Sequence, residues 1–269
     1  MYHSITFTID SETFNTWTNW HLIPVKRPHV GPPEQEIMYQ NELLYEPLNL
    51  ELPGQFGVLR QRQASWQFAV YNDYNGYNWT TIYSNVLNAL QGKIGTFVLE
   101  DDPGYFYRGR FHVSEWESGD SYSIITIEAE CEPYKYSSRQ TVTKVGRKFT
   151  FTANTDQETP CNLFIRIGVI VGTLSVVGLQ RSKLTGEAYT GAFSIANVIA
   201  GREYQILGEA RELTAKSISE DARWYIDDDV SNFIVFPTVV PGSNTVSVVG
   251  NNLTDSDVVI IVSYIPRTL

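Results

Sequence analysis

Cysteine is scarce in this sequence, and its two positions point to neither a disulfide nor a metal site. Among 269 residues there are only Cys131 and Cys161, which fall on either side of a predicted domain boundary. We therefore expect two buried thiols in a protein assembled in a reducing cytoplasm. Neither cysteine has another cysteine or a histidine close in the sequence, and the four histidines are scattered. No metal and no other cofactor is predicted.

Long apolar runs are also missing. A membrane-spanning helix needs about 18–20 consecutive apolar residues, whereas the longest apolar run lies near residues 258–262. The N-terminus, MYHSITFTID, lacks a basic region followed by an apolar one, so no signal peptide is expected. We predict no membrane partner.

Basic residues are outnumbered by acidic ones, 20 to 30, which gives a net charge of −10. A surface this acidic argues against specific binding to nucleic acid. A basic stretch, residues 137–148 with four basic side chains and no acid, separates residues 1–136 with a charge of −9 from residues 149–269 with −5. We predict an N-terminal domain over 1–136, a basic linker over 137–148 and a C-terminal domain over 149–269.

Motifs that carry enzyme chemistry are absent too. No nucleophile elbow, phosphate-binding loop, zinc-protease motif or dinucleotide fingerprint occurs, so we predict that the protein is not an enzyme. Glu128 and Glu130 can be compared with the carboxylate pair of a glycosidase. However, the arginines expected opposite them would lower their pKa values, which is the wrong direction for a general acid.

The sequence does have strong alternation and one helical pattern in its first half. Residues 2–9 alternate apolar and polar side chains, as a half-buried strand does. A helix is expected to begin at Asn78 or Thr80 and to end at Gly92. Its apolar face comprises Trp79, Ile82, Tyr83, Val86, Leu87 and Leu90. We interpret this face as core packing and not as a ligand site.

Two alternating strands, over residues 105–116 and 122–132, predict a hairpin with one charged face. Arg108, Arg110 and His112 share that face on the first strand, and Glu128, Glu130 and Glu132 share it on the second. We expect paired residue numbers to sum to 238, which sets Arg110 opposite Glu128, Arg108 opposite Glu130, Phe111 opposite Ile127 and Val113 opposite Ile125. The charged face is either solvated, which the pattern alone favours, or a surface that meets another copy of the chain. Arg108, Arg110, Glu128 and Glu130 are therefore candidate assembly-interface residues.

The second half predicts about eight short strands and no amphipathic helix. The expected strands are 163–171, 174–177, 192–198, 203–207, 214–218, 233–236, 245–249 and 258–264. Such spacing is typical of an antiparallel β-sandwich or jelly roll. Trp224 and Tyr225, flanked by acidic residues 220–221 and 227–229, are candidate sugar contacts, although we favour a solvated loop.

Several motifs together resemble the distal tail proteins of long-tailed siphophages. In the first half they are Gln91-Gly92-Lys93, Asp101-Asp102-Pro103, Tyr105-Phe106-Tyr107, Gly109-Arg110-Phe111 and Glu132-Pro133-Tyr134-Lys135-Tyr136. In the second half they are Thr159-Pro160-Cys161, Val240-Pro241-Gly242 and Tyr264-Ile265-Pro266-Arg267. The resemblance implies a mainly β chain: an N-terminal β-sandwich-like domain with one helix and a hairpin arm, then a C-terminal galectin-like β-sandwich.

This resemblance also implies a function. It predicts a structural virion protein at the distal end of the phage tail, whose N-terminal domains form a homo-oligomeric ring, expected to be a hexamer. The ring would join the tail tube protein to the tail-associated hub or fibre protein, with the C-terminal domains directed toward receptor-binding proteins or baseplate parts. The alternative is a carbohydrate-binding adhesin that uses the C-terminal sandwich, and a hydrolase with a dispersed site ranks last.

Overall fold

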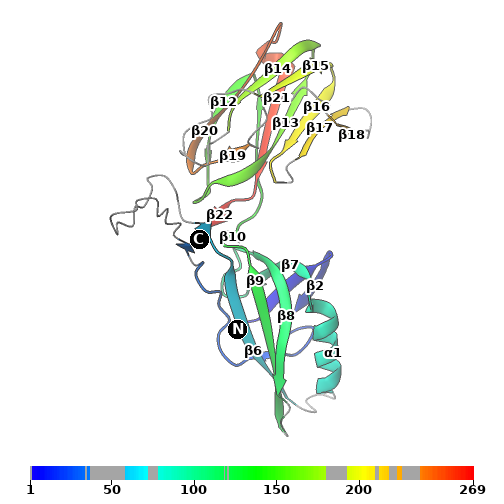
Figure 1. Ribbon diagram of the computed structural model, residues 1–269, viewed down its shortest axis with the longest axis vertical. Helices are drawn as coiled ribbons and strands as arrows, with labels where there is room; N and C mark the ends of the chain where they lie inside the picture. Colours follow the sequence, from blue (N-terminus) through cyan, green and yellow to red (C-terminus); the bar gives the residue numbers. More distant parts are fainter. Residues whose placement is uncertain are drawn as a thin grey trace, which may run out of the picture. The chain divides into compact units, whose positions relative to one another are not determined.

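The computed structural model of the chain consists mainly of strands (Figure 1). It describes residues 2–33, 35–36, 58–71, 78–117, 119, 121–179, 193–209, 212–217, 223–225 and 237–269. Within these residues there is a single α-helix, and the prediction of a mainly β protein is confirmed. The chain divides into two compact units between Ser137 and Ser138, which we call the first and the second domain.

The first domain is built on one seven-stranded sheet in which every neighbouring pair is antiparallel. In spatial order its strands are β2 (Glu12–Asn15), β1 (Ile5–Ile9), β7 (Ile94–Leu99), β8 (Tyr107–Glu117), β9 (Tyr122–Cys131), β6 (Arg62–Tyr71) and β3 (Ile23–Pro24). Two short strands, β4 (Gln35–Glu36) and β5 (Val58–Leu59), pair with each other. Strand β10 (Lys135–Tyr136) follows β9 and bridges to Phe106.

This sheet curls, so that strands far apart within it meet across the core. Strands β1 and β6 are separated by β7, β8 and β9, which in a flat sheet would place them about 19 Å apart. Yet the ring centroids of Phe7 on β1 and Trp66 on β6 are only 6.2 Å apart. Phe97 on β7 contacts both rings, at 6.1 Å and 5.0 Å. The aromatic core therefore fills the inside of the curl.

Two glycines of this curled sheet, Gly95 on β7 and Gly109 on β8, lie opposite each other. A β-carbon added at Gly95 would lie 2.5 Å from the carbonyl oxygen of Thr8. One added at Gly109 would lie 2.7 Å from the carbonyl oxygen of Glu130. Only a residue without a β-carbon lets neighbouring backbones approach this closely, so both glycines are required by the shape of the sheet.

Helix α1 (Trp79–Leu90) confirms the helix prediction. The side-chain oxygen of Asn78 caps it by accepting a hydrogen bond from the Thr80 N–H at 2.9 Å. Gly92, with a φ of +70°, follows its last turn. Its buried residues are Ile82, Val86, Ala89 and Leu90, with Trp79, Tyr83 and Leu87 partly buried against the same core. The apolar face is core packing, as expected.

The second domain is an antiparallel β-sandwich. One sheet has the order β11 (Gln140–Val145), β21 (Val258–Tyr264), β13 (Thr159–Ile167), β16 (Arg202–Leu207), β17 (Glu212–Ser217) and β18 (Arg223–Tyr225), and β19 (Thr238–Val239) pairs with β13. The other has the order β12 (Lys148–Ala153), β20 (Gly242–Gly250), β14 (Val171–Gly178) and β15 (Phe193–Val198). Apolar residues of both sheets form one buried cluster, including Phe151 and Val248 from one and Leu163 and Val262 from the other. The 3₁₀ helix η2 (Asp255–Asp257) and strand β22 (Arg267–Thr268) complete the described elements.

Most of the strands expected in the second half are present, with shifted ends. The expected strand over 163–171 is wrong at its end, because β13 stops at Ile167 and a bend precedes β14 at Val171. Strand β11 falls inside the segment 137–148 that the composition indicates as a linker. The expected strand over 233–236 lies outside the described residues.

Both cysteines are fully buried, each in the core of a different domain, as predicted. Burial raises the pKa of Cys131 to about 12 and also raises the pKa of Cys161. Neither thiol is therefore disposed to react in the folded protein. Across the described part of the chain, no helix is long and apolar enough to span a membrane.

Candidate functional site

The two faces of the β8–β9 hairpin divide as the alternation predicts. Tyr107, Phe111 and Val113 on β8 are buried, as are Ile125, Ile127, Ala129 and Cys131 on β9. On the opposite face Arg110, His112, Glu130 and Glu132 are exposed, and Arg108 and Glu128 are partly exposed. The hairpin therefore presents a polar face away from the aromatic core, which we call the charged face.

The register of this hairpin differs from the expected one by one step of two residues. Paired residue numbers sum to 240, not 238, so that Arg110 lies opposite Glu130, and His112 opposite Glu128. The expected pairs Arg110 with Glu128 and Arg108 with Glu130 are therefore wrong. Phe111 lies opposite Ala129, and Val113 opposite Ile127, in place of the expected Ile127 and Ile125.

Alternation fixes which face each side chain occupies, but it cannot fix this offset. Because glutamates stand at 128, 130 and 132, sums of 238 and 240 both set the two arginines of β8 opposite carboxylates. Toward the hairpin loop, a bulge between Val113 and Glu115 changes the sum of paired residue numbers from 240 to 241. A bulge adds one residue to one strand, and the alternation of apolar and polar residues in this sequence does not reveal where that residue is inserted.

Arg108 and Arg110 contact other groups in place of the expected glutamates. The Arg110 Nη1 donates a hydrogen bond to the Gly92 carbonyl oxygen at 2.8 Å. The Arg108 guanidinium carbon lies 4.6 Å from the ring centroid of Tyr136 and 5.7 Å from that of Phe106. Among the described residues, neither Glu128 nor Glu130 has an ion-pair or side-chain hydrogen-bond partner. The carboxylates of Glu128 and Glu130 are thus left available to another molecule.

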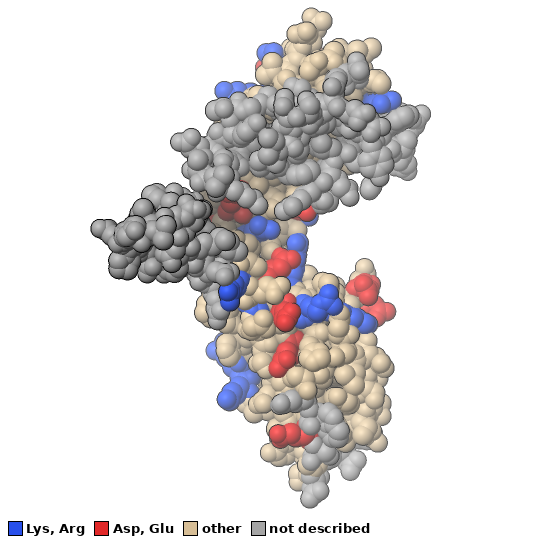
Figure 2. Space-filling model, viewed as in Figure 1, with Lys and Arg blue, Asp and Glu red and all other residues tan. Residues whose placement is uncertain are grey.

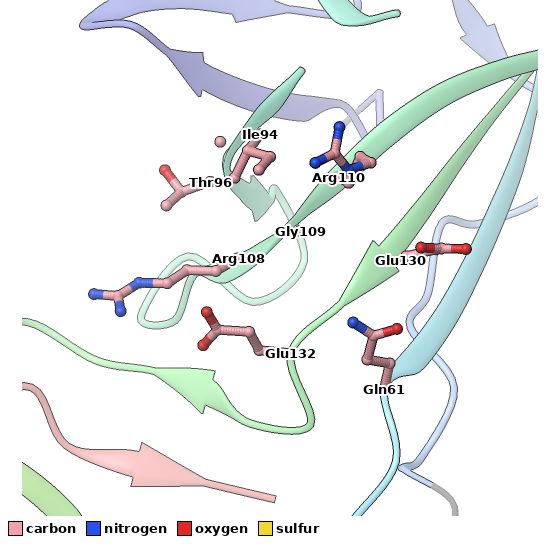
Figure 3. A pocket seen from close by; sticks show the side chains of 9 residues that line it. Gln61, Ile94, Thr96, Arg108, Gly109, Arg110, Glu130 and Glu132 are labelled. Atoms are coloured by element: carbon pink, nitrogen blue, oxygen red, sulfur yellow. The ribbon is translucent and has the colours of Figure 1, made fainter. Parts of the chain in front are cut away.

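A hollow of about 400 Å³ lies on the charged face, over β7, β8 and β9 (Figure 3). It is lined by Gln61, Ile94, Gly95, Thr96, Arg108, Gly109, Arg110, Glu130 and Glu132. The structure thus brings three of the four candidate interface residues, Arg108, Arg110 and Glu130, to one place, while Glu128 lies outside the hollow.

The hollow also contains an apolar residue that the sequence did not single out. Ile94 is 63% exposed and lies directly opposite Arg110 on the neighbouring strand. Its position could have been found from alternation, because Phe97 and Leu99 of the same strand are buried and so place residues of even number on the charged face. Exposed apolar surface bordered by charges of both signs is typical of protein–protein contacts.

Figure 2 shows acidic and basic side chains close together on the described surface of the first domain. Charges of both signs suit a contact with another protein better than the binding of a polyanion, which needs one positive field. In the described residues no group of three or more histidine, cysteine, aspartate or glutamate side chains could hold a metal ion.

A second polar cluster connects the turn after β7 to residues near the start of the chain and to the segment after β9. The Asp101 carboxylate accepts a hydrogen bond from Arg27 Nε at 2.7 Å and lies 2.9 Å from His3 Nδ1. Glu100 accepts from the Ser4 backbone N–H at 2.8 Å, and Lys135 Nζ lies 3.2 Å from Asp102. These contacts hold the pKa values of Asp101 and Glu100 below their ordinary range, chiefly through the hydrogen bonds from Arg27 and from Ser4. We call residues 100–102 the acidic turn, and these contacts indicate that its carboxylates stabilise the fold of the first domain.

The proposed sugar contacts Trp224 and Tyr225 belong to β18 at one edge of the sandwich. Their side chains lie outside the described part of the structure, as do residues 220–221 and 227–229. The sugar-binding hypothesis stays a prediction.

Comparison with solved structures shows a full-length match to a phage protein. The crystal structure of the SPP1 Dit protein, described as a paradigm of the hub adsorption apparatus in phages that infect Gram-positive bacteria, matches with a TM-score of 0.66 and 12% identity. The match covers 98% of this chain and 99% of that one. The chain therefore has the two-domain fold of that protein.

A component of the phage P2 baseplate, solved in its activated conformation with calcium, gives a TM-score of 0.45 at 9% identity over 98% of both chains, a value too low to establish a shared fold. No protein-family model and no curated protein sequence matches this chain.

Proposed function

We propose that this chain is a structural, non-catalytic protein of a phage tail tip, a hub component whose copies close into a ring, expected to be a hexamer. One observation carries the proposal: the fold match to the SPP1 Dit protein runs through both domains and leaves almost no part of either chain unmatched. The motifs that resemble siphophage distal tail proteins are spread over the same length of sequence. Two independent properties, local motifs and overall fold, thus support one assignment.

The charged face supplies a physical basis for the assembly of copies. A closed ring needs a head-to-tail contact between two different surfaces of the same chain. The charged face offers an unpartnered carboxylate at Glu130, two arginines and the exposed Ile94 within one hollow. We propose that Arg108, Arg110, Glu128 and Glu130 lie in the contact between neighbouring copies, with the solvated face as the competing interpretation.

The proposed location is the distal end of the tail. There the ring would join the tail tube protein on one side to the tail-associated hub or fibre protein on the other. Receptor-binding proteins or baseplate parts would be contacted through the second domains. Assembly would take place in the host cytoplasm, which is consistent with two free, buried thiols.

The test of the ring is the mass of the purified full-length protein. Light scattering at several concentrations, together with electron micrographs, should show closed rings whose mass is an integer multiple of the 30.5 kDa chain. A protein that stays monomeric at high concentration would contradict the ring.

The test of the interface is a charge reversal with a matched control. Glu130→Lys should weaken association by at least about tenfold, since reversing an interface charge typically costs more than a kilocalorie per mole. Glu158→Lys, which makes the same change at an exposed position of the second domain, should leave association unchanged. Equal behaviour of the two variants would reject the charged face as the interface and leave the ring itself standing.

A further inference from the structure

Strand β11 is a long, exposed edge strand of the second domain. It pairs with β21 over six consecutive residues without a bulge. No other described strand pairs with its outer side. Five of its residues are exposed and Val142 is partly exposed, and the apolar side chain of Val145 is 59% exposed.

The direction of the backbone groups of β11 follows from one hydrogen bond. The Gly146 N–H donates to the Val258 carbonyl oxygen at 2.8 Å, and these two residues are opposite each other in the β11–β21 register. In an antiparallel pair, such bonded positions recur at every second residue. The N–H and C=O groups of Val142 and Lys144 therefore point toward β21. Those of Thr141, Thr143 and Val145 point outward, where a further strand could bind them.

The basic stretch that contains β11 is only partly neutralised within its own domain. Arg139 Nη2 lies 2.8 Å from Glu209, and Arg147 Nε lies 2.9 Å from Asp255. Lys144 and Lys148 have no ion-pair partner among the described residues. Two of the four basic side chains in residues 137–148 are thus matched by acids of the same domain, and two lysines are left for a partner.

A lysine on an edge strand can also serve to prevent pairing with other chains. The other protective devices are missing here, since β11 has no proline, no bulge and no covering element among the described residues, and it exposes Val145. The backbone groups of Lys144 point toward β21. A residue placed opposite Lys144 on a strand added to the outer side of β11 would therefore form a non-hydrogen-bonded pair with it. Side chains of such pairs lie closest together, so a carboxylate placed there would contact the lysine directly.

We propose that β11 is a docking edge for an extended acidic segment of another protein, which adds to the sheet as a further strand with a carboxylate beside Lys144. Strand addition supplies affinity through main-chain hydrogen bonds and specificity through alternate side chains. A second copy of β11 is a poorer occupant, because it would bring two basic stretches together. This inference does not depend on ring formation, and its test does not read the mass of the assembly.

The test uses an end-blocked peptide of about seven residues that alternates valine and glutamate, a length typical of one strand. A matched peptide with lysine in place of each glutamate is the control. Binding to the full-length protein is followed by fluorescence anisotropy at low salt, and hydrogen exchange locates the site. We expect the acidic peptide to bind at least about tenfold more tightly than the basic one, with a preference that salt weakens. The amides of Thr141, Thr143 and Val145 should exchange fast in the free protein and slowly with the acidic peptide bound.

Two substitutions sharpen the test. Thr143→Pro removes an outward N–H without removing a bond to β21, and it should abolish binding. The control is Thr150→Pro in the edge strand β12. The Val248 N–H donates to the carbonyl oxygen of Arg147, which lies opposite it, at 2.6 Å. Bonded positions therefore recur at odd numbers, and the backbone groups of Thr150 point outward. This control variant should leave binding intact. Lys144→Glu should reverse the preference between the two peptides, and it tests the proposal even where a proline variant fails to fold.

Three results would overturn the inference. Equal affinity for both peptides would remove the charge argument, and binding that leaves β11 unprotected would place the site elsewhere. Slow exchange of Thr141, Thr143 and Val145 in the free protein would show that the edge is already covered.

Discussion

At the scale of single residues, Gly109 is a position in the sheet of the first domain that has no room for a β-carbon. A β-carbon there would lie 2.7 Å from the Glu130 carbonyl oxygen and 3.2 Å from the Cys131 α-carbon, and both are backbone atoms that cannot move aside cheaply. We predict that Gly109→Ala destabilises the first domain by about 1–3 kcal/mol, as overpacking does. The measurement is the free energy of unfolding in denaturant.

The control for this prediction is Gly104→Ala. A β-carbon at Gly104 has no atom within 4 Å, and its φ is not in the left-handed region. It should therefore change the free energy of unfolding by less than about 0.5 kcal/mol, as surface substitutions usually do. If both variants lose the same stability, the close approach at Gly109 does not explain the effect.

The acidic turn predicts how stability depends on pH. The pKa of Asp101 is lowered in the folded protein, chiefly by the hydrogen bond from Arg27, and the pKa of Glu100 is lowered chiefly by the Ser4 N–H. A carboxylate with a lowered native pKa binds fewer protons when folded than when unfolded, so its contribution is complete above its unfolded pKa and is lost as the pH falls. The free energy of unfolding should therefore fall as the pH drops below about 4.5, near the unfolded pKa values of these groups.

Asp101→Asn separates this cluster from the other carboxylates. The variant should be less stable than the natural protein at neutral pH, because the pairing with Arg27 and His3 is weakened. Its stability should also change less steeply with pH in the acid range. Parallel pH profiles of the two proteins would show that Asp101 does not contribute to the acid transition.

At the scale of elements, the N-cap of α1 offers the most direct prediction. Asn78 accepts a hydrogen bond from the Thr80 N–H at 2.9 Å, which satisfies an N–H that the helix itself cannot pair. Asn78→Ala should cost about 1 kcal/mol of stability, the usual loss for a cap. Ser84→Ala, on the exposed side of the same helix, should be neutral or slightly stabilising, since alanine is the better helix former. Thermal or denaturant unfolding of the two variants side by side measures the difference.

How far each element could be predicted depends on how local its determinants are. The helix and the two faces of the β8–β9 hairpin follow from Asn78, Gly92 and strict alternation, all visible within a few residues. The hairpin register changes at a bulge near Ser114, which leaves no periodic signal in the sequence. The sequence predicts a linker where β11 lies, because an edge strand exposed on both faces, such as QTVTKV, shows no apolar alternation. The hollow joins Ile94 on β7, Glu130 on β9 and Gln61 just before β6, and only the sheet order brings them together.

At the scale of the whole molecule, a fold can be shared at 12% identity because few residues are individually fixed by it. Strands of a sandwich require alternation and turns, which many sequences satisfy. Positions such as Gly95 and Gly109, where a backbone approaches closely, permit far less variation. The candidate interface residues are exposed or partly exposed and are not fixed by the fold in this way, so their role has to be tested directly.

The two separate cores lead to the last prediction. Cys131 lies in the core of the first domain and Cys161 in that of the second, both 0% exposed. Since a buried thiol reacts only when its surroundings open, each cysteine reports the opening of its own domain. We predict that Gly109→Ala speeds the labelling of Cys131 in mild denaturant, by about fivefold for each kilocalorie per mole of stability lost. Labelling of Cys161 should be unchanged by this substitution, as measured by mass spectrometry of the two peptides. Equal acceleration at both cysteines would mean that the two cores open as one cooperative unit, and the division near Ser137 would then not be a folding boundary.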